Sequence, residues 1–267
     1  MLSCRDQMNR IIVLPYPPKR IISLVPSQTE LLFDLGLEEE VIGITKFCVH
    51  PEKWFRNKTR VGGTKTVKAD MVASLKPDLI IANKEENVKE QVELLEKIAP
   101  VWISDVNNIE DAFNMMQSIG ELTGKKEKAA AIINQIKKDF SELAVLINQS
   151  NYKKYRTAYL IWNGPYMAAG EDTFINAMLK LGGLENILPD IPRYPEISTR
   201  ELVEKNTELI LLSSEPYPFK QKHIDTLQQA LPDAKILLAD GEVFSWYGSR
   251  MLNAAPYLQK LLEQINR

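Results

Sequence analysis

Short apolar runs alternate with amphipathic stretches along the whole of this 267-residue chain. Continuous apolar runs, such as residues 21–25 and 79–82, predict strands that are buried on both faces. Stretches in which apolar residues recur every three or four positions, such as residues 109–122, predict helices. The regular alternation of the two patterns is typical of an α/β fold with a mainly parallel sheet.

The predicted strands cover residues 11–14, 21–25, 41–45, 79–82, 101–103, 159–162, 209–212 and 236–238. The predicted helices cover residues 27–36, 69–75, 88–98, 109–122, 125–149, 173–181, 198–205, 224–231 and 252–265. In the first of these helices, Ser27 and Glu30 have the spacing of a capping box, so we expect Ser27 to be the N-cap residue.

The longest predicted helix, residues 125–149, carries a single apolar stripe and separates two similar segments. Residues 71–82 and 201–212 match each other at a constant offset of 130 positions. We therefore expect two Rossmann-like lobes with mainly parallel sheets, residues 11–123 and 151–267, joined by one connecting helix over 124–150. The plainer alternative is a long surface helix of a single domain. Two lobes on one connector would enclose a ligand cleft.

Composition narrows the class of protein. Apolar residues make up 45% of the chain and charged residues 25%, as in soluble globular proteins. A net charge of −2 predicts no nucleic-acid partner, and no apolar run is long enough to span a membrane. Residues 1–7 lack the apolar core of a signal peptide, so we expect a cytoplasmic protein if Met1 is the native start. Cys4, in a polar N-terminal tail, and Cys48, near a loop, predict neither a disulfide nor a zinc site.

The sequence contains no recognisable catalytic motif. Residues 62–66 include two glycines and a lysine but lack the order of a phosphate-binding loop. The only histidines are His50 and His223, and we expect His223, which follows Lys222, to be a solvated surface residue. We therefore expect a binding protein rather than an enzyme. An enzyme acting on a bound cofactor would have His50 and Cys48 as its only reactive pair.

Aromatic and basic residues gather near the ends of predicted strands, where α/β sheets bind their ligands. Aromatic rings offer broad faces to a flat ligand, and the arginines Arg193 and Arg250 suit a carboxylate or phosphate group. We expect His50 to make an axial or polar contact. The candidate aromatic contacts are Phe47, Trp162, Tyr166, Tyr194, Trp246 and Tyr247.

Four segments resemble the class III periplasmic binding proteins, the helical-backbone metal receptor family. Residues 19–32 resemble the family's opening strand and helix, and residues 75–80 resemble its Leu-x-Pro-Asp-Leu-Ile segment. Residues 170–171 and 181–186 resemble its second-lobe signature. The likeness spans residue 11 to the C-terminus and implies two α/β lobes on one rigid helix. Members of the family bind vitamin B12, ferric siderophores, haem or bare metal ions and deliver them to an ABC permease.

The chain looks most similar to the B12-binding branch. This resemblance implies a solute-binding protein for cobalamin or another corrinoid, with a ferric siderophore or haem as the next choices. Trp162 and Tyr194 fall where aromatic residues of that branch enclose the corrinoid, and Phe47 lies near another such position. Thr64 and Asn83 stand where the branch has tryptophans, so we expect a more polar binding face in the first lobe.

Members of the family also dock on their permease through one surface carboxylate in each lobe. Asp70 fits this role in the first lobe, whereas the residue 130 positions later is Arg200 and the nearest carboxylate is Glu201. The alternative is therefore a cytoplasmic ligand-binding sensor or scavenger with the same fold and no permease partner. In either case we expect a monomer with no intrinsic cofactor and no metal ligands of its own.

Overall fold

The computed structural model describes all 267 residues, which divide into two compact units. Unit 1 comprises Met1–Val106, Glu110–Gln135 and Tyr247–Arg250, and unit 2 comprises Asn107–Ile109, Ile136–Trp246 and Met251–Arg267. The long helix α6 (Lys126–Gln149) contributes residues to both units. The lobe boundaries expected from the sequence stay a prediction.

Unit 1 is built on a parallel sheet with the strand order β5-β4-β3-β8-β9. All five residues of β8 are buried, as expected for a central strand of a covered parallel sheet. The strands are β3 (Ile21–Ser23), β4 (Val41–Ile44), β5 (Thr59–Arg60), β8 (Leu79–Asn83) and β9 (Val101–Ser104), with a small hairpin of β6 (Gly62–Gly63) and β7 (Thr66–Val67).

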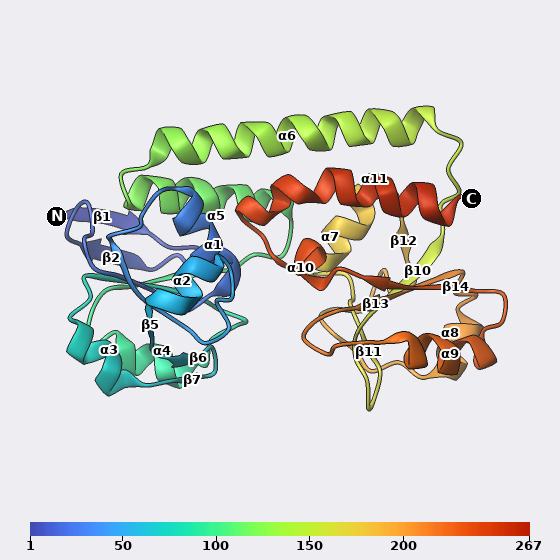
Figure 1. Cartoon of the computed structure of the whole chain (residues 1–267), viewed down its shortest axis with the longest axis horizontal. Coiled ribbons are helices and arrows are strands. Elements are labelled where there is room, and N and C mark those ends of the chain that lie inside the picture. Colours follow the sequence, from blue (N-terminus) through green and yellow to red (C-terminus); the bar gives the residue numbers. More distant parts are fainter. The chain divides into compact units, whose positions relative to one another are not determined.

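The helices of unit 1 follow the strands in alternation (Figure 1). They are α1 (Pro26–Asp34), α2 (Glu52–Asn57), α3 (Ala69–Leu75), α4 (Lys89–Leu95) and α5 (Ile109–Leu122). Helix α5 lies along the first turns of α6 (Figure 1), and a Cβ atom on Gly120 would come within 2.4 Å of the Cβ of Ala129. Glycine at position 120 therefore permits this close approach of the two helices.

Unit 2 repeats this plan with the strand order β11-β10-β13-β14, and β12 pairs with β10. Its strands are β10 (Arg156–Trp162), β11 (Met167–Ala168), β12 (Glu185–Asn186), β13 (Leu209–Ser213) and β14 (Lys235–Ala239). Only the short edge strand β11 is antiparallel. The helices are α7 (Phe174–Leu181), α8 (Thr199–Glu204), α9 (Gln221–Ala230), α10 (Gly241–Ser245) and α11 (Ala254–Ile265), with the 3₁₀ helix η1 (Ser249–Asn253).

The two units share the internal repeat that the sequence predicted. In unit 1 the strands β3, β8 and β9 are neighbours in this order, and in unit 2 the strands β10, β13 and β14 take the same places. Strands β8 and β13 begin 130 residues apart, at Leu79 and Leu209, and so do helices α3 and α8, at Ala69 and Thr199. The predicted α/β class with mainly parallel sheets is confirmed. None of the helices combines the length and the apolar character that a membrane span requires.

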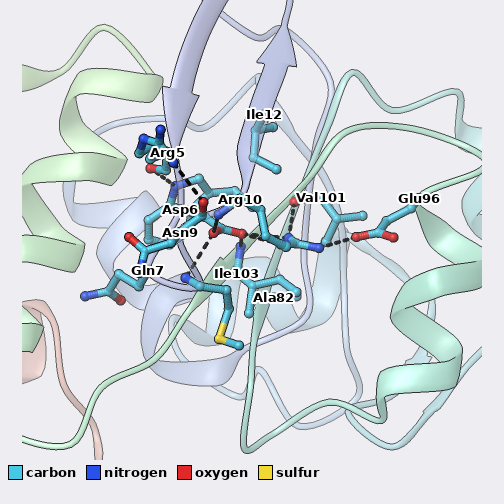
Figure 2. Close-up of polar contacts among 12 residues, drawn as sticks. Arg5, Asp6, Gln7, Asn9, Arg10, Ile12, Ala82, Glu96, Val101 and Ile103 are labelled. Carbon is cyan, nitrogen blue, oxygen red and sulfur yellow. Dashed lines mark hydrogen bonds and ion pairs between the residues drawn. The ribbon is translucent and has the colours of Figure 1, made fainter.

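The N-terminus forms a strand rather than the predicted polar tail. Strand β1 (Leu2–Arg5) pairs antiparallel with β2 (Ile11–Leu14), and the turn between them contains the buried Asp6. The Asp6 carboxylate accepts the backbone N–H of Arg10 at 2.9 Å and pairs with its guanidinium at 2.7 Å (Figure 2). The Arg10 guanidinium also donates to the carbonyl of Val101 at 2.8 Å and pairs with Glu96. These bonds hold the turn against β9, the edge strand of the sheet, which leaves fewer backbone groups of that edge open to pairing.

The predicted start of the first helix of unit 1 is wrong. The N-cap residue of α1 is Val25, without a side-chain bond, and Ser27 lies inside the first turn. Pro26 explains the shift, because its fixed φ and missing N–H suit the first position of a helix. Trp54, in α2, is buried and packs edge-on against Phe33 with ring centroids 5.4 Å apart.

Candidate functional site

In unit 2, the neighbouring parallel strands β10 and β13 end at the same edge of the sheet. Trp162 is the last residue of β10, and its side chain is 41% exposed. Its ring meets that of Tyr217, from the loop after β13, at a centroid distance of 5.6 Å and an angle of 66°. Ligands of open α/β sheets bind beyond the carboxyl ends of the strands, so this exposed indole is a candidate platform for a flat ligand.

Tyr217 is part of a larger polar and aromatic group that the sequence did not predict. Its hydroxyl oxygen lies 3.1 Å from Nε2 of His223 and 3.3 Å from Nδ2 of Asn163. Its ring also packs against Phe219 at 4.8 Å. His223 is only 7% exposed, so the expectation of a solvated surface histidine is wrong. A signal was present in the sequence, since Tyr217 stands between two prolines soon after a buried strand.

Tyr166 lies in the turn between β10, which ends at Trp162, and β11, which begins at Met167. Its side chain is half-buried and packs against the core cluster of the unit beside Tyr217. Burial, and then the neighbouring Tyr217, raise the pKa of the Tyr166 phenol. Tyr166 therefore presents a neutral hydroxyl on an apolar support.

Trp246 and Tyr247 have only 7% and 8% of their surface exposed. The indole N–H of Trp246 donates to the Glu215 carboxylate at 2.7 Å, and the Ser245 hydroxyl donates to the same oxygen at 2.9 Å. Burial raises the pKa of Glu215 more than these two bonds lower it. Trp246 thus ties α10 to the loop that carries Tyr217, and neither Trp246 nor Tyr247 offers an open ring face.

Arg193 and Tyr194 lie in a loop that packs closely against Gly170. The N–H of Gly170 donates to the carbonyl of Arg193 at 2.7 Å, and a Cβ atom at position 170 would lie 2.0 Å from the carbonyl oxygen of Ile191. The Arg193 guanidinium donates to Asn107 at 3.1 Å and lies over the ring of Tyr194 at 5.5 Å. The loop therefore presents Tyr194 half-buried and supported by a cation.

In unit 1, the loop after β4 presents two apolar side chains at the carboxyl edge of the sheet. Phe47 is 50% exposed and Val49 is 39% exposed. Between them Cys48 is fully buried, with its sulfur 3.1 Å from the Thr29 hydroxyl and 3.2 Å from the Thr45 hydroxyl. Burial raises the pKa of the Cys48 thiol. Cys48 therefore anchors the loop from inside while Phe47 and Val49 face outward.

Thr64 and Asn83, the two polar positions of the predicted first-lobe face, are buried. The Asn83 amide nitrogen donates to the carbonyl and hydroxyl oxygens of Ser104 at 3.1 and 3.0 Å. Its carbonyl oxygen accepts the backbone N–H groups of Glu85 and Glu86 at 2.9 and 3.0 Å. All four hydrogen-bonding positions of the amide are therefore used within unit 1.

Arg250 has a carboxylate partner inside unit 1. Its Nε donates to Glu30 Oε2 at 2.9 Å, and its Nη2 lies 2.8 Å from Glu30 Oε1. Burial raises the pKa of Glu30, an effect that Arg250 and the nearby His50 oppose and Asp34 reinforces. The predicted site residue Arg250 is thus engaged with a carboxylate of the protein itself.

The two predicted docking carboxylates have different surroundings. Asp70 is exposed in the first turn of α3. Glu201 is exposed too, but its carboxylate accepts both the backbone N–H and the hydroxyl of Ser198 at 2.7 Å in a capping box. These bonds lower the pKa of Glu201. Arg200, at the position equivalent to Asp70, pairs with Glu204 at 2.7 Å.

No group of three or more His, Cys, Asp or Glu side chains lies close enough together to hold a metal ion.

The sequence of this chain is similar to those of known proteins. A family model described as "Periplasmic binding protein" matches residues 21–234. The vitamin B12-binding protein of Pectobacterium carotovorum is 23% identical over 240 residues, which cover 89% of this chain and 86% of the relative. The uncharacterized ABC transporter substrate-binding lipoprotein YvrC of Bacillus subtilis is 25% identical over 77% of this chain and 67% of its own length.

Solved structures share the fold at low sequence identity. The periplasmic vitamin B12 binding protein BtuF of Vibrio cholerae has a TM-score of 0.79 and 19% identity, and the match covers 94% of this chain and 98% of that one. The periplasmic heme-binding protein RhuT of Roseiflexus sp. RS-1 has a TM-score of 0.81 and 18% identity, with coverage of 93% and 99%.

Proposed function

The chain belongs to the periplasmic binding protein family, and from this premise we propose that it is the solute-binding protein of an ABC-type importer. Its ligand is a metal chelate, with cobalamin or another corrinoid as the first choice and a ferric siderophore or haem as the next. The names of the curated relatives, a vitamin B12-binding protein and an ABC transporter substrate-binding lipoprotein, support this proposal.

The exposed indole of Trp162 is the observation that carries the proposal. A large apolar ring that is 41% exposed at the carboxyl edge of a sheet leaves apolar surface in water, and a ligand that covers this surface gains favourable free energy. Phe47, 50% exposed, offers a second ring at the corresponding edge of unit 1. Rings of this kind bind the faces of a flat macrocycle by apolar contact and stacking. The position of the ligand between the two lobes stays a prediction.

The surroundings of the other predicted contact residues decide which of them we keep as ligand contacts. We propose that Tyr166, Tyr194 and His50, all half-buried, contact the ligand beside these rings. We leave out Asn83, because its amide is saturated by unit 1, and we assign Trp246 to the support of the loop that carries Tyr217.

The surroundings of Cys48, one member of the only candidate reactive pair, favour a binding role over catalysis. Cys48 is fully buried and contacts two threonine hydroxyls, and burial raises its pKa, so its thiolate is disfavoured. Without a thiolate this residue is a weak nucleophile.

The test is titration of the protein with cyanocobalamin, haemin and a ferric catecholate, followed by tryptophan fluorescence and by the shift of the melting temperature. We expect at least one of these chelates to bind. Replacement of Trp162 by Ala should then weaken binding about tenfold, since a lost ring contact is worth roughly 1.5 kcal/mol. Phe47→Ala should act in the same direction.

Matched controls are Val203→Ala in unit 2 and Leu94→Ala in unit 1, which truncate apolar side chains that are 50% and 51% exposed. Neither lies at the carboxyl edge of a sheet, so neither should change the affinity. Absence of binding by all three chelates would overturn the proposal. Binding that survives both Trp162→Ala and Phe47→Ala unchanged would overturn the assigned site.

One observation favours a second candidate, a ligand-binding sensor or scavenger without a permease. The docking pair is asymmetric, because Arg200 occupies the position equivalent to Asp70 and the Glu201 carboxylate is used to cap α8. Affinity purification from detergent-extracted membranes separates the two. Recovery of permease subunits with the wild-type chain, but not with Asp70→Lys, supports the importer; no recovery with either supports the sensor.

A further inference from the structure

The hydrogen bonds of His223 favour one position for the proton on its imidazole ring. Nδ1 of His223 lies 2.8 Å from the backbone nitrogen of Lys220 and 3.1 Å from its carbonyl oxygen. The shorter contact, in which the Lys220 N–H donates, assigns Nδ1 as the acceptor. In a neutral imidazole the proton then resides on Nε2. Nε2 lies 3.1 Å from the hydroxyl oxygen of Tyr217, so His223 donates a hydrogen bond to Tyr217.

The same hydroxyl oxygen receives a second donor. Nδ2 of Asn163, in the turn that follows β10, lies 3.3 Å from it. A hydroxyl has two lone pairs and one hydrogen. With both lone pairs of Tyr217 facing N–H groups, its own hydrogen is directed elsewhere. These two nitrogens are the only protein atoms that hydrogen-bond to the hydroxyl.

We propose that Tyr217 is a ligand-contact residue that donates its hydroxyl hydrogen to an oxygen atom of the ligand. His223 and Asn163 are positioning residues that orient this donor. The inference rests on the proposed function and deepens it, because it specifies a chemical group that the ligand must carry.

That group is a carbonyl or carboxylate oxygen at the edge of a flat organic ligand. The Tyr217 ring stands edge-on to Trp162 at 5.6 Å, so a ligand that covers the indole and extends beyond it also reaches Tyr217. Corrinoid amides, haem propionates and siderophore carbonyls all offer such oxygens. A hydrated metal ion presents donors instead of acceptors and would not satisfy the Tyr217 hydroxyl.

The first experiment compares affinities of the wild type and Tyr217→Phe for whichever of cyanocobalamin, haemin and a ferric catecholate the wild type binds. We expect Tyr217→Phe to lose about tenfold in affinity, because a buried acceptor of the ligand is left unsatisfied. Tyr16→Phe, at an exposed tyrosine of unit 1, is the matched control and should bind normally. Equal binding by Tyr217→Phe would overturn the inference while the proposed function stands.

The second experiment tests the positioning residues. Asn163→Asp replaces a donor by an acceptor that captures the Tyr217 hydrogen, so the affinity should fall as far as in Tyr217→Phe. Combined with Tyr217→Phe it should cause no further loss, whereas a purely structural role would add to the effect. His223→Gln can keep an N–H near the hydroxyl and should bind more tightly than His223→Asn, which can retain only the acceptor for Lys220.

The third experiment needs no ligand. Nitrogen chemical shifts of the His223 ring, recorded at a pH where the imidazole is neutral, should report protonation at Nε2. Protonation at Nδ1 would overturn the inference, because Nε2 would then accept the Tyr217 hydrogen. In a ferric complex, loss of a phenolate-to-iron absorption band in Tyr217→Phe would also overturn it in favour of metal coordination. If the wild type binds none of the three chelates, the proposed function fails and this inference fails with it.

Discussion

Arg250 and Glu30, 220 residues apart in the sequence, form a two-contact ion pair within unit 1. The guanidinium keeps 15% of its side-chain surface exposed and the carboxylate 18%. Arg250 was expected to bind an anionic group of the ligand. In the structure it is already paired with a carboxylate of the protein. The pair also holds the segment Tyr247–Arg250 to helix α1.

Breaking this pair should destabilise the fold. Arg250→Leu leaves the Glu30 carboxylate poorly solvated, and we expect a loss of about 2 kcal/mol in the free energy of unfolding, less than for a fully buried pair because some exposure remains. Unfolding by denaturant measures this free energy. The double variant Glu30→Gln with Arg250→Leu should recover part of the lost stability. Arg56→Leu, which breaks a largely exposed pair with Glu52, is the control. A loss no larger than the control's would contradict the prediction.

Gly170 should tolerate no side chain. A Cβ atom there would lie 2.0 Å from the Ile191 carbonyl oxygen and 2.9 Å from that of Arg193, so Gly170→Ala must displace the loop that carries Tyr194. We expect a loss of roughly 1–3 kcal/mol in stability, the range for overpacking, together with weaker ligand binding. In Gly182→Ala the nearest atom is the end of the flexible Leu258 side chain at 3.2 Å, so this control should be milder. Equal effects of the two variants would argue against the close contact.

Glu215 should make stability depend on pH in an identifiable direction. Burial raises its pKa in the folded state, so in the window between its unfolded and folded pKa values the native protein binds more protons than the unfolded chain. The contribution of Glu215 to stability is therefore present at low pH and is lost as the pH rises through the folded pKa.

Melting curves of the wild type and Glu215→Gln between pH 4 and about pH 8 test this dependence, because the amide keeps an acceptor for Trp246 and does not titrate in this range. The stability of the wild type relative to the variant should fall as the pH rises. A constant difference, or a rise, would show that the carboxyl does not have a raised pKa.

The N-terminal turn should protect the sheet edge in unit 1. Asp6→Ala removes the acceptor of three backbone N–H groups and the main partner of Arg10, so we expect a loss of about 2–3 kcal/mol. Hydrogen exchange should increase in β9, to which the turn is bonded. Asp190→Ala, at an exposed aspartate of unit 2, should change neither measurement. Unchanged exchange in β9 with Asp6→Ala would show that the turn does not protect the edge.

The order and type of most elements follow from the sequence alone. The bounds of β2 and α5 match the prediction at both ends, and the repeat of 130 residues reappears in the positions of β8 and β13. These features depend on the spacing of apolar residues within a few turns or along a few strand positions. The wrong start of α1 also has a local cause, because the preference of Pro26 for the first helical position outweighed the capping pattern of Ser27.

The candidate site depends on contacts between residues far apart in the chain. The sequence pointed to Trp162 and Phe47, which end or follow strands and are exposed, but not to the partners of the charged and polar groups. Only the tertiary structure pairs Arg250 with Glu30, Trp246 with Glu215 and Tyr217 with His223. The physical reason is the range of the interactions. Apolar periodicity is a local property of the chain, whereas a hydrogen bond or an ion pair forms only where folding brings a donor and an acceptor within about 3 Å of each other.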